Sequence, residues 1–308
     1  MRFTLRQLQV FAAVAIQGSV SRAAESLALS QSAASTSLAE LERITSSQLF
    51  ERAGKRLSLS SFGAELLPQV LALLEQAHEI EALFNGKSGF RSLAVGATLT
   101  VGNYLATLLI AKFMQSHPEC QTSLHVSNTE QMVQQIARYE LDLGLIEGDC
   151  QHPDIIVQPW VADELVVFCA PEHPLALRGE ASLEELCQQA WILREKGSGT
   201  RRTFDQAMRH HLNRLNIRLE LEHTEAIKRA VEAGLGVSCI SRLALREAFR
   251  RGSLVALETP QLDLVRHFYF IWNRQKYRSA AMNEFLELCK ALTRDVTRTD
   301  QIVLPSLA

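Results

Sequence analysis

Two short helices follow each other closely in residues 19–49, SVSRAAESLALSQSAASTSLAELERITSSQL. Ser21 is the predicted N-cap of the first helix, with Glu25 in its first turn. Leu29 and Ser30 interrupt the helical pattern before the second helix begins. The apolar residues of the second helix recur at helical spacing: Ala34, Leu38, Leu41 and Ile44. The pattern predicts two amphipathic helices joined by a tight turn.

The flanking segments complete a small domain around these two helices. Upstream, residues 4–17 carry apolar side chains at helical spacing, and Gly18 ends the pattern. Downstream, ERAGKRLSLS at 51–60 contains a turn signal at Ala53–Gly54, followed by alternating apolar and polar residues. The sequence therefore predicts three short helices followed by a β-hairpin, the arrangement of a winged helix-turn-helix.

The second helix of residues 19–49 has short polar side chains opposite its apolar face. In a helix-turn-helix this helix enters the major groove, where such side chains contact base edges and phosphates. A helix N-terminus can bind a phosphate, and basic residues on the hairpin can follow the DNA backbone. The predicted DNA-binding residues are Ser21, Arg22, Gln31, Ser32, Ser35, Thr36, Arg52, Lys55 and Arg56. The alternative interpretation is a tri-helical protein-interaction module with a polar face.

The 308 residues are 47% hydrophobic and 21% charged, a composition typical of a globular protein with more than one domain. The net charge is −2, but residues 1–60 hold seven Lys or Arg against four Glu, a local net charge of +3. The sequence has neither a long apolar stretch nor a cleavable signal at its N-terminus, so we expect a cytoplasmic protein with no membrane partner. Six scattered cysteines without a C-x-x-C pair argue against a disulfide framework or a zinc site.

Residues 61–86 are predicted to form one long helix, and NGKSG at 85–89 a linker. The apolar residues of the helix fall on two adjacent stripes, with Leu66, Val70, Leu73, Ala77, Ile80 and Phe84 on one and Leu67, Leu71 and Leu74 on the other. Because a solitary helix with two apolar stripes needs partners on both sides, we expect this helix to pair with another chain as well as with its own domain.

From residue 91 onward, strands alternate with helices in two series, which predicts an α/β arrangement with parallel sheets. The strand HFYFIW and the helix at 279–292 come after the second series, so the chain is expected to return to the first lobe and to cross between the lobes twice. The predicted fold is a multidomain α/β protein. Its expected parts are a DNA-binding domain at 1–60, a linker helix at 61–90 and a regulatory domain at 91–308, with lobe I at about 91–162 and 267–308 and lobe II at about 163–266.

A cleft between two such lobes is the usual place for a small ligand. Small polar residues lie where a strand ends and the next helix begins. Free N–H groups and hydroxyls at these positions favour the binding of an anion. The predicted effector-binding residues are Thr98, Thr100, Ser127, Asn128, Thr129, Glu147, Ser198, Gly199, Thr200, Thr224 and Glu225. Each hydroxyl can instead be a helix N-cap alone. The carboxylate of Glu147 would repel an anion unless it is protonated or paired. Its alternative roles are to accept a hydrogen bond from a donor group of the ligand or to pair with a cation between the lobes.

The run LRQLQVFAAVAIQGSVSRAAESLALSQSAASTSLAELERITSSQLFERAGKRLSLSSFGAELLP resembles the N-terminal signature of LysR-type transcriptional regulators. This resemblance implies a winged helix-turn-helix, a long dimerising linker helix and a two-lobed regulatory domain of the periplasmic-binding-protein type (type 2). It also implies homodimers paired through residues 61–86, homotetramers formed through the regulatory domains, inverted-repeat promoter sites on double-stranded DNA, and RNA polymerase as a candidate partner. Many relatives carry arginine where this chain has Thr36, which places the contact expected there in question.

The segments LGLIEG, ELVVFCAP, WILREKGSGTR, EAIKRAVEAGLGVSCIS and NRQKY resemble a LysR subgroup linked to sulfur-oxyanion sensing, which implies sulfite as the effector. Another oxyanion or a carboxylate would suit the same donors. The family also implies ligand contacts by the loops of Thr98 and Thr100 and of Ser198–Thr200.

Three other classes of function are disfavoured by the sequence. An enzyme is disfavoured because GSGTRR lacks the spacing of a phosphate-binding loop, no G-x-S-x-G occurs, and the adjacent His210 and His211 point in different directions on a helix. No catalytic residue, cofactor or metal is therefore predicted. A redox switch at Cys150 is disfavoured because its acidic neighbours should raise the pKa of the thiol. A non-regulatory solute-binding protein would need export.

Overall fold

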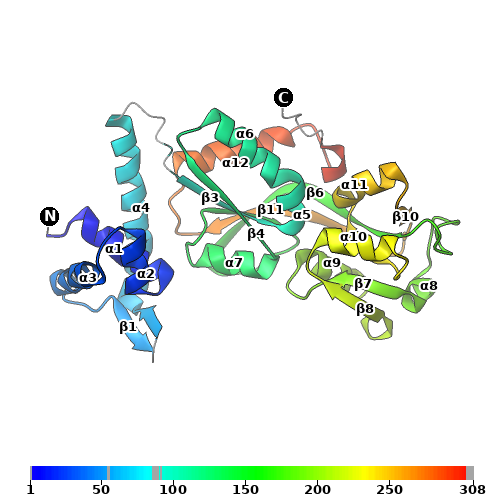
Figure 1. Cartoon of the computed structure of the whole chain (residues 1–308), viewed down its shortest axis with the longest axis horizontal. Helices are drawn as coiled ribbons and strands as arrows, with labels where there is room; N and C mark the ends of the chain where they lie inside the picture. Colours follow the sequence, from blue (N-terminus) through cyan, green and yellow to red (C-terminus); the bar gives the residue numbers. More distant parts are fainter. Residues whose placement is uncertain (1, 54–55, 85–89, 91, 303–308) are drawn as a thin grey trace.

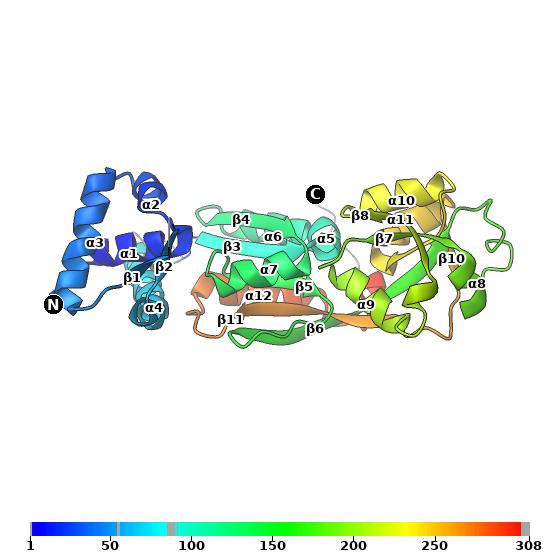
Figure 2. The same cartoon turned by 90° about the horizontal axis from the view of Figure 1, so that it is seen from below.

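A computed structural model describes residues 2–53, 56–84, 90 and 92–302. The molecule is elongated, with the predicted DNA-binding domain at one end and the two lobes of the predicted regulatory domain following in line (Figures 1 and 2). The first domain contains α1 (Leu5–Gln17), α2 (Val20–Ser26), α3 (Gln31–Thr45), β1 (Phe50–Ala53), β2 (Arg56–Leu59) and the long helix α4 (Ser61–Phe84). The predicted winged helix-turn-helix and linker helix are confirmed.

Local capping explains where the first two helices begin. Thr4 forms a capping box with Gln7 at the start of α1, and Gly18 ends that helix with a left-handed φ of 61°. The N-cap of α2 is Ser19, whose Oγ accepts a hydrogen bond from Arg22 N. The prediction of Ser21 as N-cap is wrong, because the chain is already helical from Val20 and Ser21 lies in the first turn.

We name α1–α3, β1, β2 and the first half of α4 the head. Its core is formed by apolar side chains from all of these helices, with Phe11 and Phe50 in edge-to-face contact at 5.6 Å between ring centroids. The face of α4 that packs into this core contains Leu67, Val70 and Leu74, so it draws on both predicted stripes rather than on one.

Lobe I is built on one edge of a seven-stranded mixed sheet. Three parallel strands, β3 (Ser92–Thr98), β4 (Gln121–Ser127) and β5 (Leu143–Glu147), pair in the order β4-β3-β5. The sheet continues through the antiparallel strands β11 (Val265–Asn273) and β6 (Ile155–Cys169). The helices of the lobe are α5 (Leu99–Val101), a π-helical turn (Gly102–Ala106), α6 (Thr107–Ser116), α7 (Thr129–Ala137) and α12 (Ala280–Leu292).

Lobe II contains α8 (Leu183–Gln188), β7 (Ala190–Arg194), α9 (Gly199–Ala207), a 3-10 turn (Leu212–Arg214), β8 (Asn216–Leu221), α10 (Thr224–Glu232), β9 (Ser238–Ser241), α11 (Arg242–Arg251) and β10 (Val255–Leu257). Strands β7 and β8 are parallel, whereas β9 and β10 pair with β6 in antiparallel fashion. The expectation of purely parallel sheets is therefore wrong, because β6 and β11 add antiparallel pairings in both lobes.

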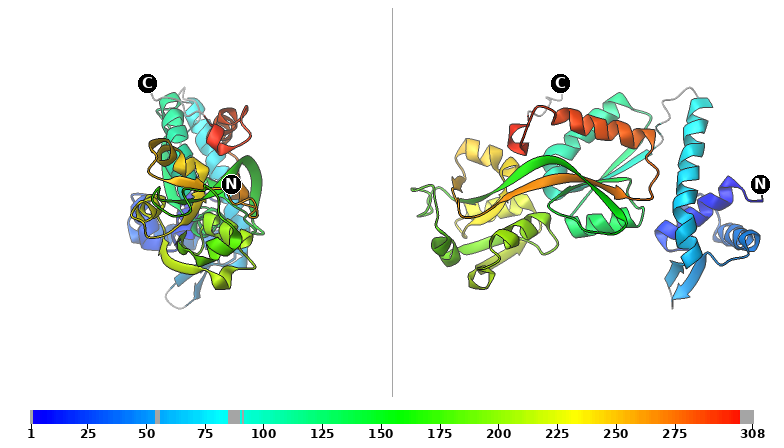
Figure 3. Two further views of the ribbon diagram at one scale, coloured as in Figure 1. Left: turned by 90° about the vertical axis from the view of Figure 1, so that its right-hand side faces the viewer. Right: turned by 180° about the vertical axis from the view of Figure 1, so that it is seen from behind.

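Strand β6 is a single 15-residue strand that runs through both lobes. Figure 3 shows β6 and β11 crossing from one lobe to the other. At the crossing, Arg266 of β11 faces Asp163 of β6. The chain thus crosses between the lobes twice, in β6 and in β11, as predicted. Near the C-terminus, Arg298 bridges to Ala162 at the crossing, and Ile302 O accepts a hydrogen bond from Arg246 of α11.

Candidate DNA-binding head and effector cleft

The first half of α3 presents a polar face to solvent. Ser30 caps the helix by accepting a hydrogen bond from Ala33 N at 3.2 Å. The predicted base-contacting residues are all exposed: Gln31, Ser32, Ser35 and Thr36. Ala34, Leu38 and Leu41 are buried on the other side of the helix. The exposed side chains are therefore free to meet a DNA groove while the apolar face holds α3 to the head.

The predicted phosphate-contacting residues lie near the start of α2 and on the hairpin. Ser21 and Arg22 are exposed, and the Arg22 guanidinium donates to Gln17 O at the end of α1. Arg52 and Arg56 lie on β1 and β2, in register with Leu57 and Ala53 respectively. Lys55 lies outside the described residues.

Large apolar side chains along another stripe of α4 are exposed within the described chain. Leu73 is 39% exposed, Ile80 52%, Leu83 70% and Phe84 84%. An exposed apolar face of this kind is typical of a protein–protein contact.

The two lobes face each other through the carboxyl ends of their parallel strands. Thr98, Ser127 and Glu147 end β3, β4 and β5 at one edge of the sheet in lobe I. Arg194 ends β7 in lobe II, and Ser198 caps the following helix α9 by accepting from Arg201 N. Polar groups from separate strands meet in this way at a ligand cleft in α/β proteins.

Several predicted cleft residues hold the lobes together in this structure. Gly199 N in lobe II donates to Thr129 Oγ1 in lobe I at 3.1 Å, and Thr200 Oγ1 donates to Glu147 Oε1 at 3.1 Å. Glu130 N in lobe I donates to Gly197 O in lobe II at 3.3 Å. A Cβ on Gly199 would lie only 1.9 Å from Glu147 O, so only glycine permits this approach. The lobes are in direct contact here.

A buried charge cluster lies beside these contacts. Arg266 Nη2 is 3.3 Å from Glu147 Oε2, and Arg266 Nε is 2.8 Å from Asp163 Oδ2. Arg194 Nη1 approaches Glu147 Oε1 at 3.9 Å. Burial lowers the pKa of Arg266, but the carboxylates of Glu147 and Asp163 outweigh it and leave the pKa raised. Glu147 is therefore paired with two cations, one of which, Arg194, belongs to lobe II.

Three buried side-chain donors in the described residues have no hydrogen-bond partner. They are Thr98 Oγ1, Arg194 Nη1 and Ser238 Oγ. Thr98 ends a strand at the cleft edge of lobe I, and Arg194 does so in lobe II. Unpartnered buried donors are rare, because each costs free energy unless something satisfies it. They indicate where a ligand could be bound.

A cavity of about 310 Å³ opens between the lobes. Its lining residues are Leu99, Asn103, Val126, Ser127, Asn128, Gln131, Glu195, Glu222 and His223. The cavity therefore includes the predicted Ser127 and Asn128. Asn128 is also the N-cap of α7, accepting from Gln131 N at 3.0 Å.

The remaining predicted residues lie at the same boundary. Thr100 is buried in α5, and Thr224 is buried at the start of α10. Glu225 Oε1 accepts a hydrogen bond from Tyr104 OH of lobe I at 2.6 Å and pairs with Lys228 Nζ. Tyr104 and Lys228 thus form a second contact between the lobes, which the sequence did not single out.

Comparisons with known proteins agree with this architecture. Residues 5–64 match the model of the bacterial regulatory helix-turn-helix protein, lysR family, and residues 87–294 match the LysR substrate binding domain. The chain belongs to the LysR family of transcriptional regulators. It is a DNA-binding regulator with an effector-binding domain. The uncharacterized HTH-type transcriptional regulator YeiE of Escherichia coli K12 is 44% identical over 289 residues, covering 94% of this chain and 98% of that protein.

Two solved structures extend the comparison. The regulatory domain of CcmR from Synechocystis PCC6803, in complex with 2-PG, is 31% identical with a TM-score of 0.62, covering 67% of this chain and 98% of that one. A full-length OxyR variant from Pseudomonas aeruginosa has a TM-score of 0.70 at 23% identity, covering 94% of each chain. The OxyR likeness shows that the fold is shared over almost the whole LysR regulator.

The cysteines of this LysR regulator are poorly placed for redox sensing. Cys150 is half-buried and the other five are buried. Burial raises the pKa of Cys150, while nearby Arg202 opposes the shift, and burial raises the pKa of Cys169 to about 11. The pKa of Cys150 moves in the direction expected from the sequence, but burial rather than acidic neighbours is the main cause. A raised pKa leaves little thiolate at neutral pH.

The described part of the LysR regulator offers no evident metal site, because it contains no group of three or more His, Cys, Asp or Glu side chains placed to hold a metal ion. Among the same residues, none of the helices combines the length and apolar character needed to span a membrane.

Proposed function

We propose that this LysR regulator senses a small anion, with sulfite as the first candidate, in the cleft between its two lobes, and that the bound anion changes how its heads engage promoter DNA. Another oxyanion or a small carboxylate is the alternative within the same chemistry. The predicted contacts are the hydroxyls and N–H groups of Thr98, Thr100, Ser127–Thr129, Ser198–Thr200 and Thr224. Glu147 and Glu225 would act through the cations with which they pair.

The observation that carries this proposal is that Arg194 Nη1, at the end of β7, makes no hydrogen bond. The Arg194 side chain is only 1% exposed, and its other two nitrogens are held by Glu195 at 2.8 and 2.9 Å. Nη1 lies 3.9 Å from Glu147 Oε1, too far for a hydrogen bond, so it remains a cationic donor without a hydrogen-bond partner between the lobes, next to the Thr200–Glu147 contact. An anion is the ligand that such a donor favours. The regulatory domain of CcmR, 31% identical, was solved with a bound small molecule, which supports a ligand role for this domain.

The proposed DNA-binding unit contains more than one head. The exposed stripe of α4 favours homodimers, and the family favours homotetramers on inverted-repeat promoter sites, with RNA polymerase as a candidate partner in the cytoplasm. A local charge of only +3 in residues 1–60 supports the use of several heads, because linked weak contacts bind much more tightly than one. Ser21, Arg22, Gln31, Ser32, Ser35, Thr36, Arg52, Lys55 and Arg56 are the proposed DNA contacts.

A thermal-shift screen of the full chain tests the anion. Sulfite, sulfate and small carboxylates would be titrated against the wild type and against Thr200→Val, with Thr203→Val on α9 as the matched control. A ligand at a hundred times its Kd stabilises the folded state by about 2.7 kcal/mol, which raises Tm by several degrees. We expect a rise with one anion that Thr200→Val weakens and Thr203→Val does not. The absence of a rise in Tm with every one of these anions would contradict anion sensing.

A further inference from the structure

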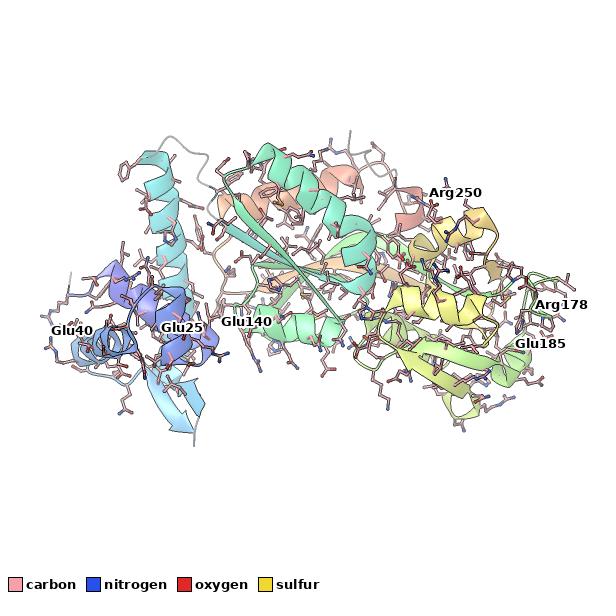
Figure 4. The ribbon with its side chains drawn as sticks, in the orientation of Figure 1. Glu25, Glu40, Glu140, Arg178, Glu185 and Arg250 are labelled. Carbon is pink, nitrogen blue, oxygen red and sulfur yellow. The ribbon has the colours of Figure 1, made fainter. Side chains whose placement is uncertain are left out.

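The head contacts lobe I at a corner formed by Tyr139, immediately after α7. The Tyr139 ring packs against the hydrophobic core of the head, although Tyr139 itself belongs to lobe I. Figure 4 shows the neighbouring residue Glu140 at the end of α7 that faces the head. A partly buried aromatic side chain from a different domain that packs against the core of the head indicates a built contact rather than chance proximity.

Tyr139 occupies a backbone position that favours glycine. Its φ is +60°, Tyr139 N donates to Ile136 O, and Glu140 N donates to Gln135 O. These two hydrogen bonds are those of a Schellman motif, in which the left-handed residue is usually glycine because a side chain there is strained. A tyrosine at this position therefore costs conformational free energy. The same strained residue supplies the ring that contacts the head.

The docking surface is small and incompletely filled. A cavity of about 380 Å³ separates Ala15, Leu59 and Leu67 of the head from Tyr139 and Gln275 of lobe I. A second contact joins Glu79 of α4 to Tyr277 OH and Ala280 N, at 3.0 and 3.1 Å. Contacts this limited can open and close without unfolding either domain.

Helix α7 connects this surface to the cleft. At its N-terminal end, Thr129 and Glu130 bond to Gly199 and Gly197 of lobe II. At its C-terminal end, Asn273 Nδ2 donates to Ala137 O, and Tyr139 follows two residues later. Nine helical residues span about 14 Å, so one rigid element touches both the opposite lobe and the head.

We propose that the Tyr139 corner of lobe I is a docking surface for the chain's own head, and that α7 couples this docking to closure of the cleft. When the lobes part, α7 loses its bonds to lobe II, and a small shift of the helix displaces the Tyr139 ring from the head. Packed helices do shift by such amounts between two states. This coupling gives the proposed anion sensing a route to the DNA-binding end, but its test requires neither anion nor DNA.

The experiment measures hydrogen–deuterium exchange of the full chain in β2 and the first half of α4. Tyr139→Gly keeps the left-handed turn and removes the ring, whereas Tyr139→Phe keeps the ring. We expect exchange in these segments to rise about threefold or more in Tyr139→Gly, because lost docking favours local opening, and to stay at the wild-type rate in Tyr139→Phe. Wild-type exchange in Tyr139→Gly would overturn the docking surface.

The coupling is tested by forcing the lobes apart. Gly199→Ala places a Cβ against Glu147 O, and Thr129→Val removes the acceptor of Gly199 N. On the wild-type background, each variant should raise the rate of exchange in β2 and α4. On the Tyr139→Gly background, neither variant should raise it further. The control variant Gln206→Ala, at an exposed position of α9, should leave exchange unchanged on both backgrounds. The coupling is overturned if neither variant alters exchange in the head, or if both alter it equally with and without the Tyr139 ring.

Discussion

The head and the cleft place their polar side chains in opposite ways. Gln31, Ser32 and Ser35 lie on one helix and are exposed, whereas Thr98, Thr129 and Thr200 come from three separate elements and are each 1% exposed. The head offers its polar groups to a partner that approaches from outside. The cleft already uses many of its polar groups to join the lobes, so a ligand there must exchange with protein–protein bonds or find unused donors. DNA can thus bind the head without displacing existing contacts, whereas effector binding alters contacts within the regulatory domain.

The largest expected effect comes from removing the charge that holds the cleft together. Arg266→Met leaves Glu147 and Asp163 buried without their main cation, which should lower the free energy of unfolding by about 3–5 kcal/mol. Arg250→Met is the matched control, because the Arg250–Glu247 pair is exposed and should contribute about 1 kcal/mol or less. Urea denaturation of both variants measures the difference. Similar losses in the two would contradict a structural role for the cluster.

The same contrast governs what could be predicted from sequence. The exposed face of α3 follows from local helical spacing, so its polar residues could be identified directly. Arg194 and Arg266 could not, because their burial depends on strands far apart in the chain. The two apolar runs of β6 likewise carry no local sign that they form one strand; their continuity depends on pairing with β11, which lies far along the chain.

An intermediate effect is expected at the head. Ser35→Ala should weaken binding to the preferred DNA site by about 0.5–1.5 kcal/mol, the contribution of one neutral hydrogen bond, and reduce discrimination between sites. Ala39→Ser, which adds a hydroxyl to an exposed position later in α3, is the control and should leave affinity unchanged. Titration of a site obtained by selection from random DNA measures both. If Ser35→Ala discriminated between selected and random DNA as well as the wild type does, that result would contradict a role of this side chain in recognising the DNA sequence.

The smallest effect is expected at Cys150. Because burial raises the pKa of its thiol, alkylation by iodoacetamide should be slower than for a free cysteine near neutral pH and should keep increasing above the ordinary thiol pKa of about 8.5. Mass spectrometry of the modified peptide follows the rate, with N-acetylcysteine as reference. Rapid alkylation that levels off near neutral pH would indicate a reactive thiolate and favour a redox role.

The state of the cleft is proposed to control how the heads engage DNA, and a footprint on a selected DNA site measures this directly. The footprint is recorded with and without the anion that raises Tm most, for the wild type and for Thr200→Val. We predict that the anion changes the length or pattern of protection in the wild type and has a weaker effect in Thr200→Val. Identical protection of the wild type with and without a bound anion would contradict control of the heads by the cleft.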